Sequence, residues 1–237
     1  HYMAAVLTYE SVNIDKVVEY IDECKRVLFP DEHRGIVVKP PDINRSDVAF
    51  TVVFDDDEPR DANHGHISFG LSAVKGVGDK AVDAVIAERR ERGPFQSLYE
   101  FCERVPLHAV TRATIDALIK CGAFDSVHGL DKRSAMTEAV DAAIQAGQSA
   151  ASDRKAGQLS FFESFVEASD ASDPSSVSVA VSLPNVSPWP TAEQLKYEKS
   201  VLGFYVSSHP LDLYRDEMDR FTTCTIADAK DMRGKTP

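Results

Sequence analysis

The stretch Leu71-Ser72-Ala73-Val74-Lys75-Gly76-Val77-Gly78-Asp79-Lys80-Ala81-Val82 decides the fold of this chain of 237 residues. Two glycines separated by one valine interrupt a helical pattern of apolar residues, and Val85 and Ile86 continue the pattern afterwards. Glycine has no Cβ, so it can adopt a positive φ and lets another backbone approach closely. The stretch therefore predicts two helices joined by a tight turn, which is the helix-hairpin-helix pattern.

The turn of this pattern has the chemistry of an anion site. The helix that starts after Gly78 has backbone N–H groups without intrahelical acceptors and the positive end of a helix dipole. Two lysines add positive charge beside the turn, whereas Asp79 adds a negative charge. We therefore expect the turn to bind the phosphates of duplex DNA without reading its sequence, through Lys75, Gly76, Val77, Gly78, Asp79 and Lys80. The alternative is a tight turn between two core helices that binds no ligand.

A second, degenerate copy of the pattern follows at residues 118–124, Leu118-Ile119-Lys120-Cys121-Gly122-Ala123-Phe124. Phe124 stands where the second glycine would be, and its side chain would keep a sugar-phosphate backbone at a distance. We expect this copy to serve in packing.

The charge of the chain limits where nucleic acid could bind. The formal net charge is −12, and a negative surface repels phosphate. Residues 64–122 carry eight basic and seven acidic residues, so the acidic excess lies elsewhere, including the run Asp55-Asp56-Asp57-Glu58. Any contact with DNA must therefore be local.

The four cysteines, Cys24, Cys102, Cys121 and Cys224, form no Cys-x-x-Cys pair. This spacing favours buried free thiols in a reducing compartment over zinc or redox chemistry. Since no stretch has the roughly 20 apolar residues of a membrane helix, we expect a cytoplasmic protein with no membrane partner.

The rest of the pattern predicts a mainly α fold with a small β-hairpin. Residues 13–29 are typical of an amphipathic helix with Asn13 as N-cap. Residues 48–54 and 66–69 have strand composition and flank an acidic turn. From residue 71 to about 146 the pattern is helical, and residues 147–157 and 168–187 have the composition of flexible segments. A further helix is expected from Thr191, as a possible N-cap, to Gly203, and a short one near residues 213–221.

A short apolar peptide, Gln158-Leu159-Ser160-Phe161-Phe162, lies between the two polar stretches. Exposed leucine and phenylalanine need a cover. The peptide could dock in extended form on a partner, with Leu159 and Phe162 in apolar pockets. It could equally fold back, with Phe165, onto the helices of its own domain.

Taken together, several blocks in one order resemble the alpha subunits of bacterial DNA polymerase III, the C family of replicative polymerases. The resemblance covers nearly the whole chain. Its carriers are Met3-Ala4-Ala5-Val6-Leu7, Pro40-Pro41-Asp42-Ile43-Asn44, residues 70–78, 118–125 and 157–162, Leu202-Gly203-Phe204-Tyr205 and His209-Pro210.

The resemblance implies that successive segments of the chain have different functions. Residues 1–63 would close the fingers region, and residues 64–146 would form a helix-hairpin-helix domain that holds duplex DNA. Residues 147–190 would be a flexible segment whose peptide 158–162 binds the sliding clamp (beta subunit), with Phe161 where many such motifs carry leucine. Residues 191–237 would lead helically toward an OB-fold. The remaining partner would be the rest of the polymerase III holoenzyme.

The same resemblance implies which functions lie outside this chain. The parent would be a DNA-directed DNA polymerase whose palm domain, upstream, holds two Mg²⁺ ions about 4 Å apart. The run 55–58 is not expected to converge on one point, and His64 and His66 near Asp61 are expected to be solvated. We therefore expect no catalytic residue, metal site or cofactor here, and no polymerase activity from the chain alone. A protein–protein adaptor without DNA binding is the alternative.

Overall fold

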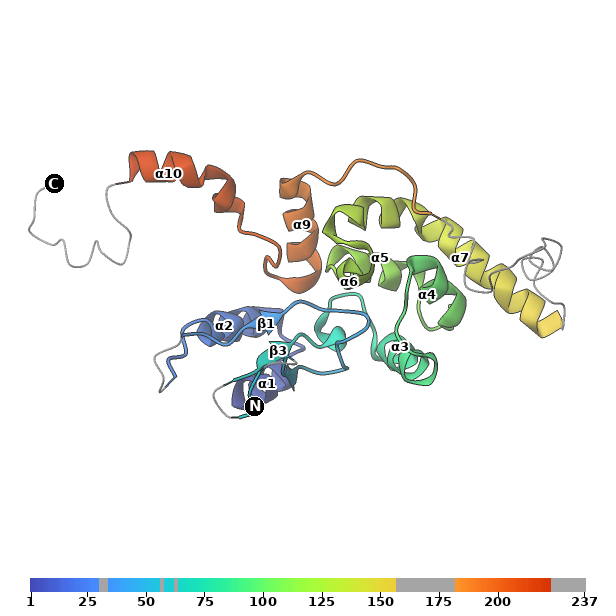
Figure 1. Ribbon diagram of the computed structural model, residues 1–237, viewed down its shortest axis with the longest axis horizontal. Coiled ribbons are helices and arrows are strands. Elements are labelled where there is room, and N and C mark those ends of the chain that lie inside the picture. The colour runs from blue at the N-terminus through green and yellow to red at the C-terminus, as the bar shows by residue number, and fades with distance from the viewer. Residues whose placement is uncertain (30–33, 56–57, 62–63, 157–181, 223–237) are drawn as a thin grey trace, which may run out of the picture.

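The computed structural model describes residues 1–29, 34–55, 58–61, 64–156 and 182–222. These residues form a mainly helical protein with one small sheet, which confirms the predicted fold class (Figure 1). The predicted clamp-binding peptide Gln158–Phe162 and the fourth cysteine, Cys224, lie outside the described residues.

The N-terminal part combines two helices with the sheet. Helix α1 covers Tyr2–Tyr9 and α2 covers Ile14–Cys24. Asn13 caps α2 as predicted, because its side chain accepts the Lys16 N–H at 3.4 Å. The helix ends five residues before the predicted position 29, and the chain after it turns back so that Ile36 N–H donates to the Cys24 carbonyl.

The sheet has three strands in the order β1-β3-β2. Strands β2 (Thr51–Val53) and β3 (His66–Ser68) are antiparallel, with Val52 opposite Ile67, which confirms the predicted hairpin. Strand β1 (Val38–Lys39) lies parallel to β3 on its other edge and was not predicted. Its two residues precede Pro40-Pro41 and carry too little pattern to signal a strand.

The central part is helical, as predicted from residue 71 onward. Its elements are η1 (Leu71–Ala73), α3 (Asp79–Arg92), α4 (Leu98–Arg104), α5 (Arg112–Lys120), α6 (Asp125–His128), η2 (Leu130–Lys132) and α7 (Arg133–Ala156). One prediction is wrong in detail, because the helix expected before the glycine turn is a single 3₁₀ turn.

Helix α7 also continues well past residue 146, where a flexible connection was expected. The alanines of residues 149–156 favour a helix. Gly147, at the predicted boundary, is required by packing: a Cβ there would collide with the Cys102 carbonyl of α4. The glycine therefore allows α7 and α4 to approach closely.

The C-terminal part consists of α9 (Thr191–Leu202), η3 (Pro210–Tyr214) and α10 (Arg215–Phe221). Thr191 was expected as N-cap, but it is the first helical residue, and Pro190 occupies the cap position. Gly203 ends α9 with φ +82°, as predicted. Figure 1 shows α9 between α10 and the helices α5 and α6.

Helix α9 contacts every other part of the described chain. The Val201 carbonyl accepts the Lys75 N–H at 2.9 Å. A Cβ at Gly203 would lie 2.6 Å from Ile14 of α2, so the helix end is pressed against the N-terminal part. On α5, the Lys120 ammonium lies 5.0 Å from the centre of the Tyr197 ring.

A buried ion-pair network joins α9 to the central helices. The Arg133 guanidinium, 2% exposed, donates to both oxygens of Asp125 at 2.9 and 2.5 Å and to Glu198 at 2.7 Å. The fully buried Glu198 uses its second oxygen to accept the N–H groups of Val206 and Ser207. Both Glu198 oxygens thus have partners, which a buried carboxylate needs.

The three described cysteines are buried free thiols, as predicted. Burial raises the pKa of Cys24 to about 11 and the pKa values of Cys102 and Cys121 to about 12. These thiols are therefore protonated near neutral pH and serve as core residues.

None of the helices in the described ranges combines the length and apolar character needed to span a membrane.

Replacing Glu198 with alanine should lower the free energy of unfolding by about 3–5 kcal/mol, because Arg133 loses a buried partner and two N–H groups lose their acceptor. Urea unfolding measures this difference. The matched control is Glu193→Ala on the same helix, where an exposed carboxylate is removed and a change within about 0.5 kcal/mol is expected. Equal stability of the two variants would contradict the assignment.

Candidate nucleic-acid interface

The glycine turn before α3 has the geometry that the sequence predicted, with one correction. Gly76 has φ +90°, which an L-residue rarely adopts. Gly78 has φ −85° and an extended backbone, so its expected positive φ is wrong. No atom lies within 4 Å of a Cβ built at Gly78, so the glycine leaves open space beside the start of α3.

Val77 anchors the turn. Its side chain is 8% exposed and belongs to the apolar core, and its N–H donates to the Val74 carbonyl at 3.1 Å. The residues on either side, Gly76 and Gly78, are exposed. The valine therefore fixes the turn on the core while both glycines face outward.

The turn presents a set of unused backbone donors. Among the residues that the structure describes, no acceptor is found for the N–H groups of four exposed residues, Gly76, Gly78, Asp79 and Lys80. No side chain caps α3. Adjacent free N–H groups at a helix start, together with the helix dipole, form an anion-binding geometry.

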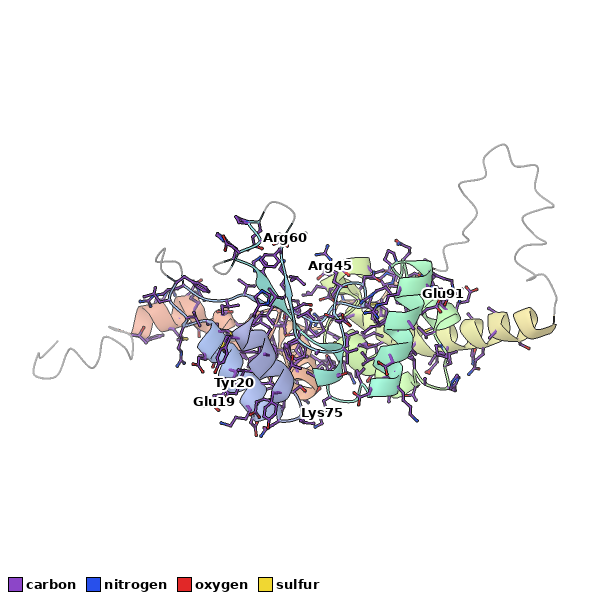
Figure 2. The ribbon with its side chains drawn as sticks, turned by 90° about the horizontal axis from the view of Figure 1, so that it is seen from below. Glu19, Tyr20, Arg45, Arg60, Lys75 and Glu91 are labelled. Carbon is purple, nitrogen blue, oxygen red and sulfur yellow. The ribbon has the colours of Figure 1, made fainter. Side chains whose placement is uncertain are left out.

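The charges around the turn are mixed. Lys75 and Lys80 are exposed and form no ion pair within the described ranges. Asp79, the first residue of α3, is also exposed and reduces the positive potential. Figure 2 shows Lys75 at one edge of the molecule and Arg45 and Arg60 toward the opposite edge. The six predicted residues thus lie on one turn, in which five are exposed and Val77 is buried.

The second copy of the pattern is a buried turn, consistent with the predicted packing role. Gly122 has φ +83°, and a Cβ there would collide with the Arg133 guanidinium. The Ala123 N–H donates to the Leu118 carbonyl, and the Ala123 carbonyl accepts from Ile43. Phe124 is fully buried and packs edge-on against Phe101 at 5.1 Å. No backbone donor of this turn is presented to a ligand in the way that the first turn presents four.

The block Pro40-Pro41-Asp42-Ile43-Asn44 also has a structural role. The Asn44 side chain exchanges two hydrogen bonds with the backbone of Phe95, at 2.9 and 2.7 Å. Arg89 of α3 donates to the carbonyls of Ile43 and Ser46. These bonds hold α3 against the N-terminal part, a long-range arrangement that no local pattern signalled.

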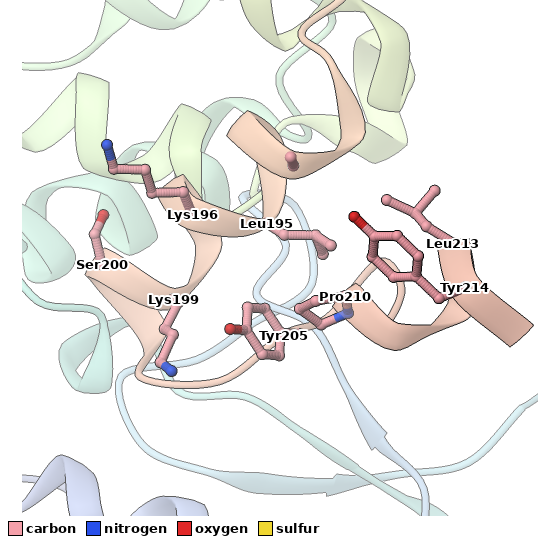
Figure 3. Close-up of a pocket in the computed structure, with 9 residues that line it drawn as sticks. Leu195, Lys196, Lys199, Ser200, Tyr205, Pro210, Leu213 and Tyr214 are labelled. Atoms are coloured by element: carbon pink, nitrogen blue, oxygen red, sulfur yellow. The ribbon is translucent and has the colours of Figure 1, made fainter. Parts of the chain in front are cut away.

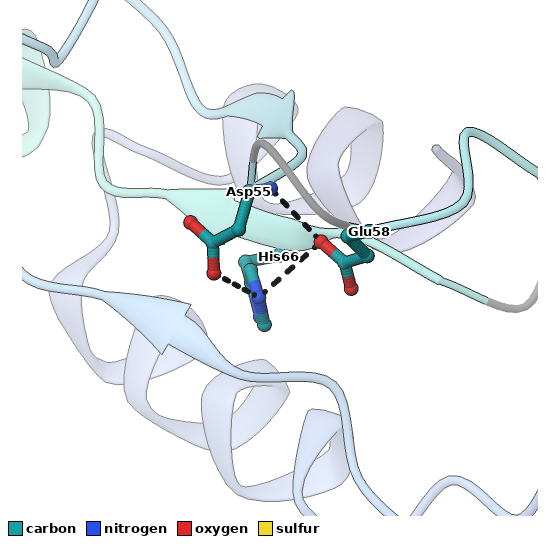
Figure 4. Close-up of side chains that lie close together, drawn as sticks. All are labelled: Asp55, Glu58 and His66. Atoms are coloured by element: carbon teal, nitrogen blue, oxygen red, sulfur yellow. Dashed lines mark hydrogen bonds and ion pairs between the residues drawn. The ribbon is translucent and has the colours of Figure 1, made fainter.

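Asp55, Glu58 and His66 form a cluster that the sequence reasoning missed (Figure 4). His66 Nε2 lies 3.0 Å from an Asp55 oxygen and 3.4 Å from a Glu58 oxygen. The expectation that the acidic run does not converge is therefore wrong for Asp55 and Glu58, because strand β3 brings His66 beside both carboxylates. Asp56 and Asp57 lie outside the described residues. Both histidines were expected to be solvated. This is wrong for His66, whose ring pairs with Asp55. His64 is exposed, and its ring contacts Asp61 at 2.8 Å.

Neighbouring groups hold the two carboxylates in their charged form. Lys39 donates to Asp55 at 2.6 Å and lowers the pKa of that carboxyl, while the Gly65 N–H lowers the pKa of Glu58. The buried Nδ1 of His66 has no partner among the described residues. A histidine that ligates a metal through Nε2 normally donates its Nδ1–H to an acceptor. The cluster is thus best explained as a bridge in which Nε2–H donates to Asp55 and lies beside the Glu58 carboxylate.

A family model described as a helix-hairpin-helix motif matches residues 35–135, which include both turns. Alpha subunits of DNA polymerase III from Pseudomonas aeruginosa and Haemophilus influenzae are 35% and 34% identical to this chain over 98% and 99% of its length. That of Vibrio cholerae is 33% identical over 98%.

The chain is homologous to a segment of DNA polymerase III alpha subunits. The resemblance drawn from the sequence blocks is thereby confirmed. The chain spans less than a fifth of the length of these relatives, 19% for the Pseudomonas aeruginosa subunit and 18% for the Haemophilus influenzae subunit. The homology therefore concerns one segment of these subunits.

The two glycine turns should respond oppositely to alanine. Gly122→Ala should lower the free energy of unfolding by about 2 kcal/mol or more, because it adds a strained φ and displaces the Arg133 guanidinium. Gly78→Ala should change it by less than about 1 kcal/mol, since φ is ordinary and the space is open. Thermal or urea unfolding of both variants tests this, and a larger loss at Gly78 would contradict the geometry described above.

Proposed function

We propose that this chain is the part of a bacterial DNA polymerase III alpha subunit that grips the backbone of duplex DNA and tethers the polymerase to the sliding clamp. The observation that carries the first half is the exposed Gly76–Lys80 turn with its four free N–H groups. The homology supports the polymerase context, since the relatives are named as alpha subunits.

The grip on DNA is electrostatic and positional. A phosphate placed beside Gly78 receives hydrogen bonds from adjacent N–H groups and faces the positive end of the α3 dipole. The ammonium groups of Lys75 and Lys80 add long-range attraction. Because phosphates carry no sequence information, the contact holds any duplex, as replication requires.

The chain contributes binding, and chemistry belongs to the parent. We assign residues 1–63 to the end of the fingers, 64–146 to the DNA-binding domain, 147–190 to the clamp-binding segment and 191–237 to the connection toward an OB-fold. Nucleotidyl transfer with Mg²⁺ is assigned to the palm of the whole subunit, which acts with the polymerase III holoenzyme in the cytoplasm. No cofactor is assigned to this chain.

The tether is assigned to the peptide Gln158–Phe162. This peptide suits docking in extended form, with Gln158 at the rim of the binding site and with Leu159 and Phe162 in apolar pockets. A clamp that encircles DNA keeps the attached polymerase near its template and so raises the effective DNA concentration at the active site.

The DNA half is tested by fluorescence anisotropy of the 237-residue chain with duplex DNA over a salt series. Wild-type binding should weaken as salt rises, with a shallow slope because few phosphates are contacted. Gly78→Glu should weaken binding at low salt by at least about tenfold, because a carboxylate replaces the space for phosphate. Arg45→Gln lowers the net charge by one unit, as Gly78→Glu does, but at the opposite edge, and it should bind DNA as the wild type does (Figure 2). Absence of salt-dependent binding by the wild type would favour the adaptor without DNA binding.

The clamp half is tested with the double variant Gln158→Ala, Phe162→Ala. Its affinity for the sliding clamp should fall by at least about tenfold, since the anchors of the peptide are removed, while its DNA affinity stays unchanged. Gly78→Glu is the reciprocal control and should retain clamp binding. Surface plasmon resonance on immobilised clamp provides the measurement, and equal loss of both functions in either variant would contradict the separation of the two sites.

A further inference from the structure

The exposed face of α9 carries basic side chains that no ion pair uses. Helical spacing places Lys196, Lys199 and Ser200 on one exposed face, opposite the buried Glu198 and Leu202. Within the described part of the chain, neither lysine has a carboxylate within ion-pair distance. Most other described lysines and arginines of the helices are paired with acids. These two charges are therefore available to an anionic ligand.

The neighbourhood of these lysines supports their orientation toward the surface. Figure 3 shows Lys199 beside the ring of Tyr205, with Ser200 and Lys196 on the same helix. The Lys199 ammonium lies 5.3 Å from the Tyr205 ring centre, which is cation–π distance. The side chains border an open pocket of about 440 Å³.

The acids of α9 do not cancel this charge. Glu198 is buried and accepts hydrogen bonds from Arg133 and from two backbone N–H groups. Glu193 is exposed but lies at the other end of the helix from Val201, where it accepts the Tyr197 hydroxyl. The half of α9 that leads to Gly203 therefore has a positive surface.

This basic face is attached to the phosphate turn by the backbone. The Lys75 N–H donates to the Val201 carbonyl at 2.9 Å, so the turn and the end of α9 are in direct contact. At a rise of about 1.5 Å per residue, Lys199 lies about 3 Å and Lys196 about 7.5 Å along the axis from Val201. One strand of duplex DNA carries a phosphate for about every 3.4 Å of its axis. A strand that continues from the turn along α9 thus passes one or two further phosphates.

We propose that Lys196 and Lys199 form a second contact for the phosphates of duplex DNA, continuous with the Gly76–Lys80 turn. This inference rests on the proposed function, because the DNA is the same molecule. The bond from the Lys75 N–H to the Val201 carbonyl places the turn at the C-terminal end of α9, two residues along the helix from Lys199. This proximity of two groups of exposed donors favours DNA, with its regularly spaced phosphates, over an acidic protein segment as the ligand. Lys196 and Lys199 bind as point charges, and the site reads no base.

The test is the salt dependence of duplex binding by the double variant Lys196→Gln, Lys199→Gln of the whole chain. Each lost phosphate contact should reduce the slope of log K against log salt by about 0.9, so the double variant should lose about 2. Its affinity at the lowest salt should fall about tenfold. The double variant Lys196→Arg, Lys199→Arg keeps the charges and should keep the slope. The double variant Arg45→Gln, Arg60→Gln removes two positive charges at the opposite edge and is the charge-matched control (Figure 2).

Gly78→Glu measured in the same series separates the two proposals. A wild-type slope in the double glutamine variant, with weak binding by Gly78→Glu, would overturn the α9 contact and leave the turn intact. A reduced slope in the glutamine variant with normal binding by Gly78→Glu would support α9 and overturn the turn. Loss of slope in the arginine variant as well would also overturn the inference, because the positive charge would then not be the cause. Unchanged melting temperatures verify that all variants are folded.

Discussion

The Arg133–Glu198 ion pair is the interaction on which the arrangement of this molecule depends. A buried guanidinium cannot be left without partners, and here it has two carboxylates, one from the start of α6 and one from the middle of α9. The pair therefore fixes α9 on the central helices. Glu198 then holds the chain after α9 through Val206 and Ser207, so that one carboxylate orders both the helix and its exit.

The position of α9 in turn determines what the glycine turn exposes. The Lys75 N–H points inward because the Val201 carbonyl receives it, and Val77 is held in the core. The N–H groups of Gly76, Gly78, Asp79 and Lys80 have no acceptor among the described residues and lie on the exposed side of the turn. An anion-binding geometry thus arises from packing on one side and the absence of caps on the other, in a protein whose net charge is strongly negative.

Local features of this structure could be predicted from the sequence, because their causes are local. The Asn13 cap, the positive φ of Gly76 and the stop at Gly203 each depend on the residue itself and its neighbours. The degenerate turn at Gly122 could be assigned to packing because Phe124 excludes a close ligand. The same reasoning placed a flexible segment at residues 147–157, where α7 continues and Gly147 packs against a neighbour 45 positions away.

The contacts that escaped prediction join residues that are distant in the sequence. Arg133 and Glu198 are 65 positions apart, and no periodicity connects them. The meeting of Asp55 and Glu58 with His66 depends on the pairing of β2 with β3, and the bond from Lys75 to Val201 depends on the placement of α9. The conformation of the glycine turn was therefore partly predictable from its residues, whereas its attachment to the rest of the protein was not.

Helix α7 has a geometric consequence for the segment that follows it. The chain leaves α7 at Ala156 and is back beside its first turn at Ser187, whose carbonyl accepts from the Ser134 hydroxyl. These two points are about 33 Å apart along the helix, at 1.5 Å per residue. The intervening 157–186 has a contour length of about 100 Å when fully extended. The chain that joins the two ends of α7 is thus about three times as long as the distance between them requires.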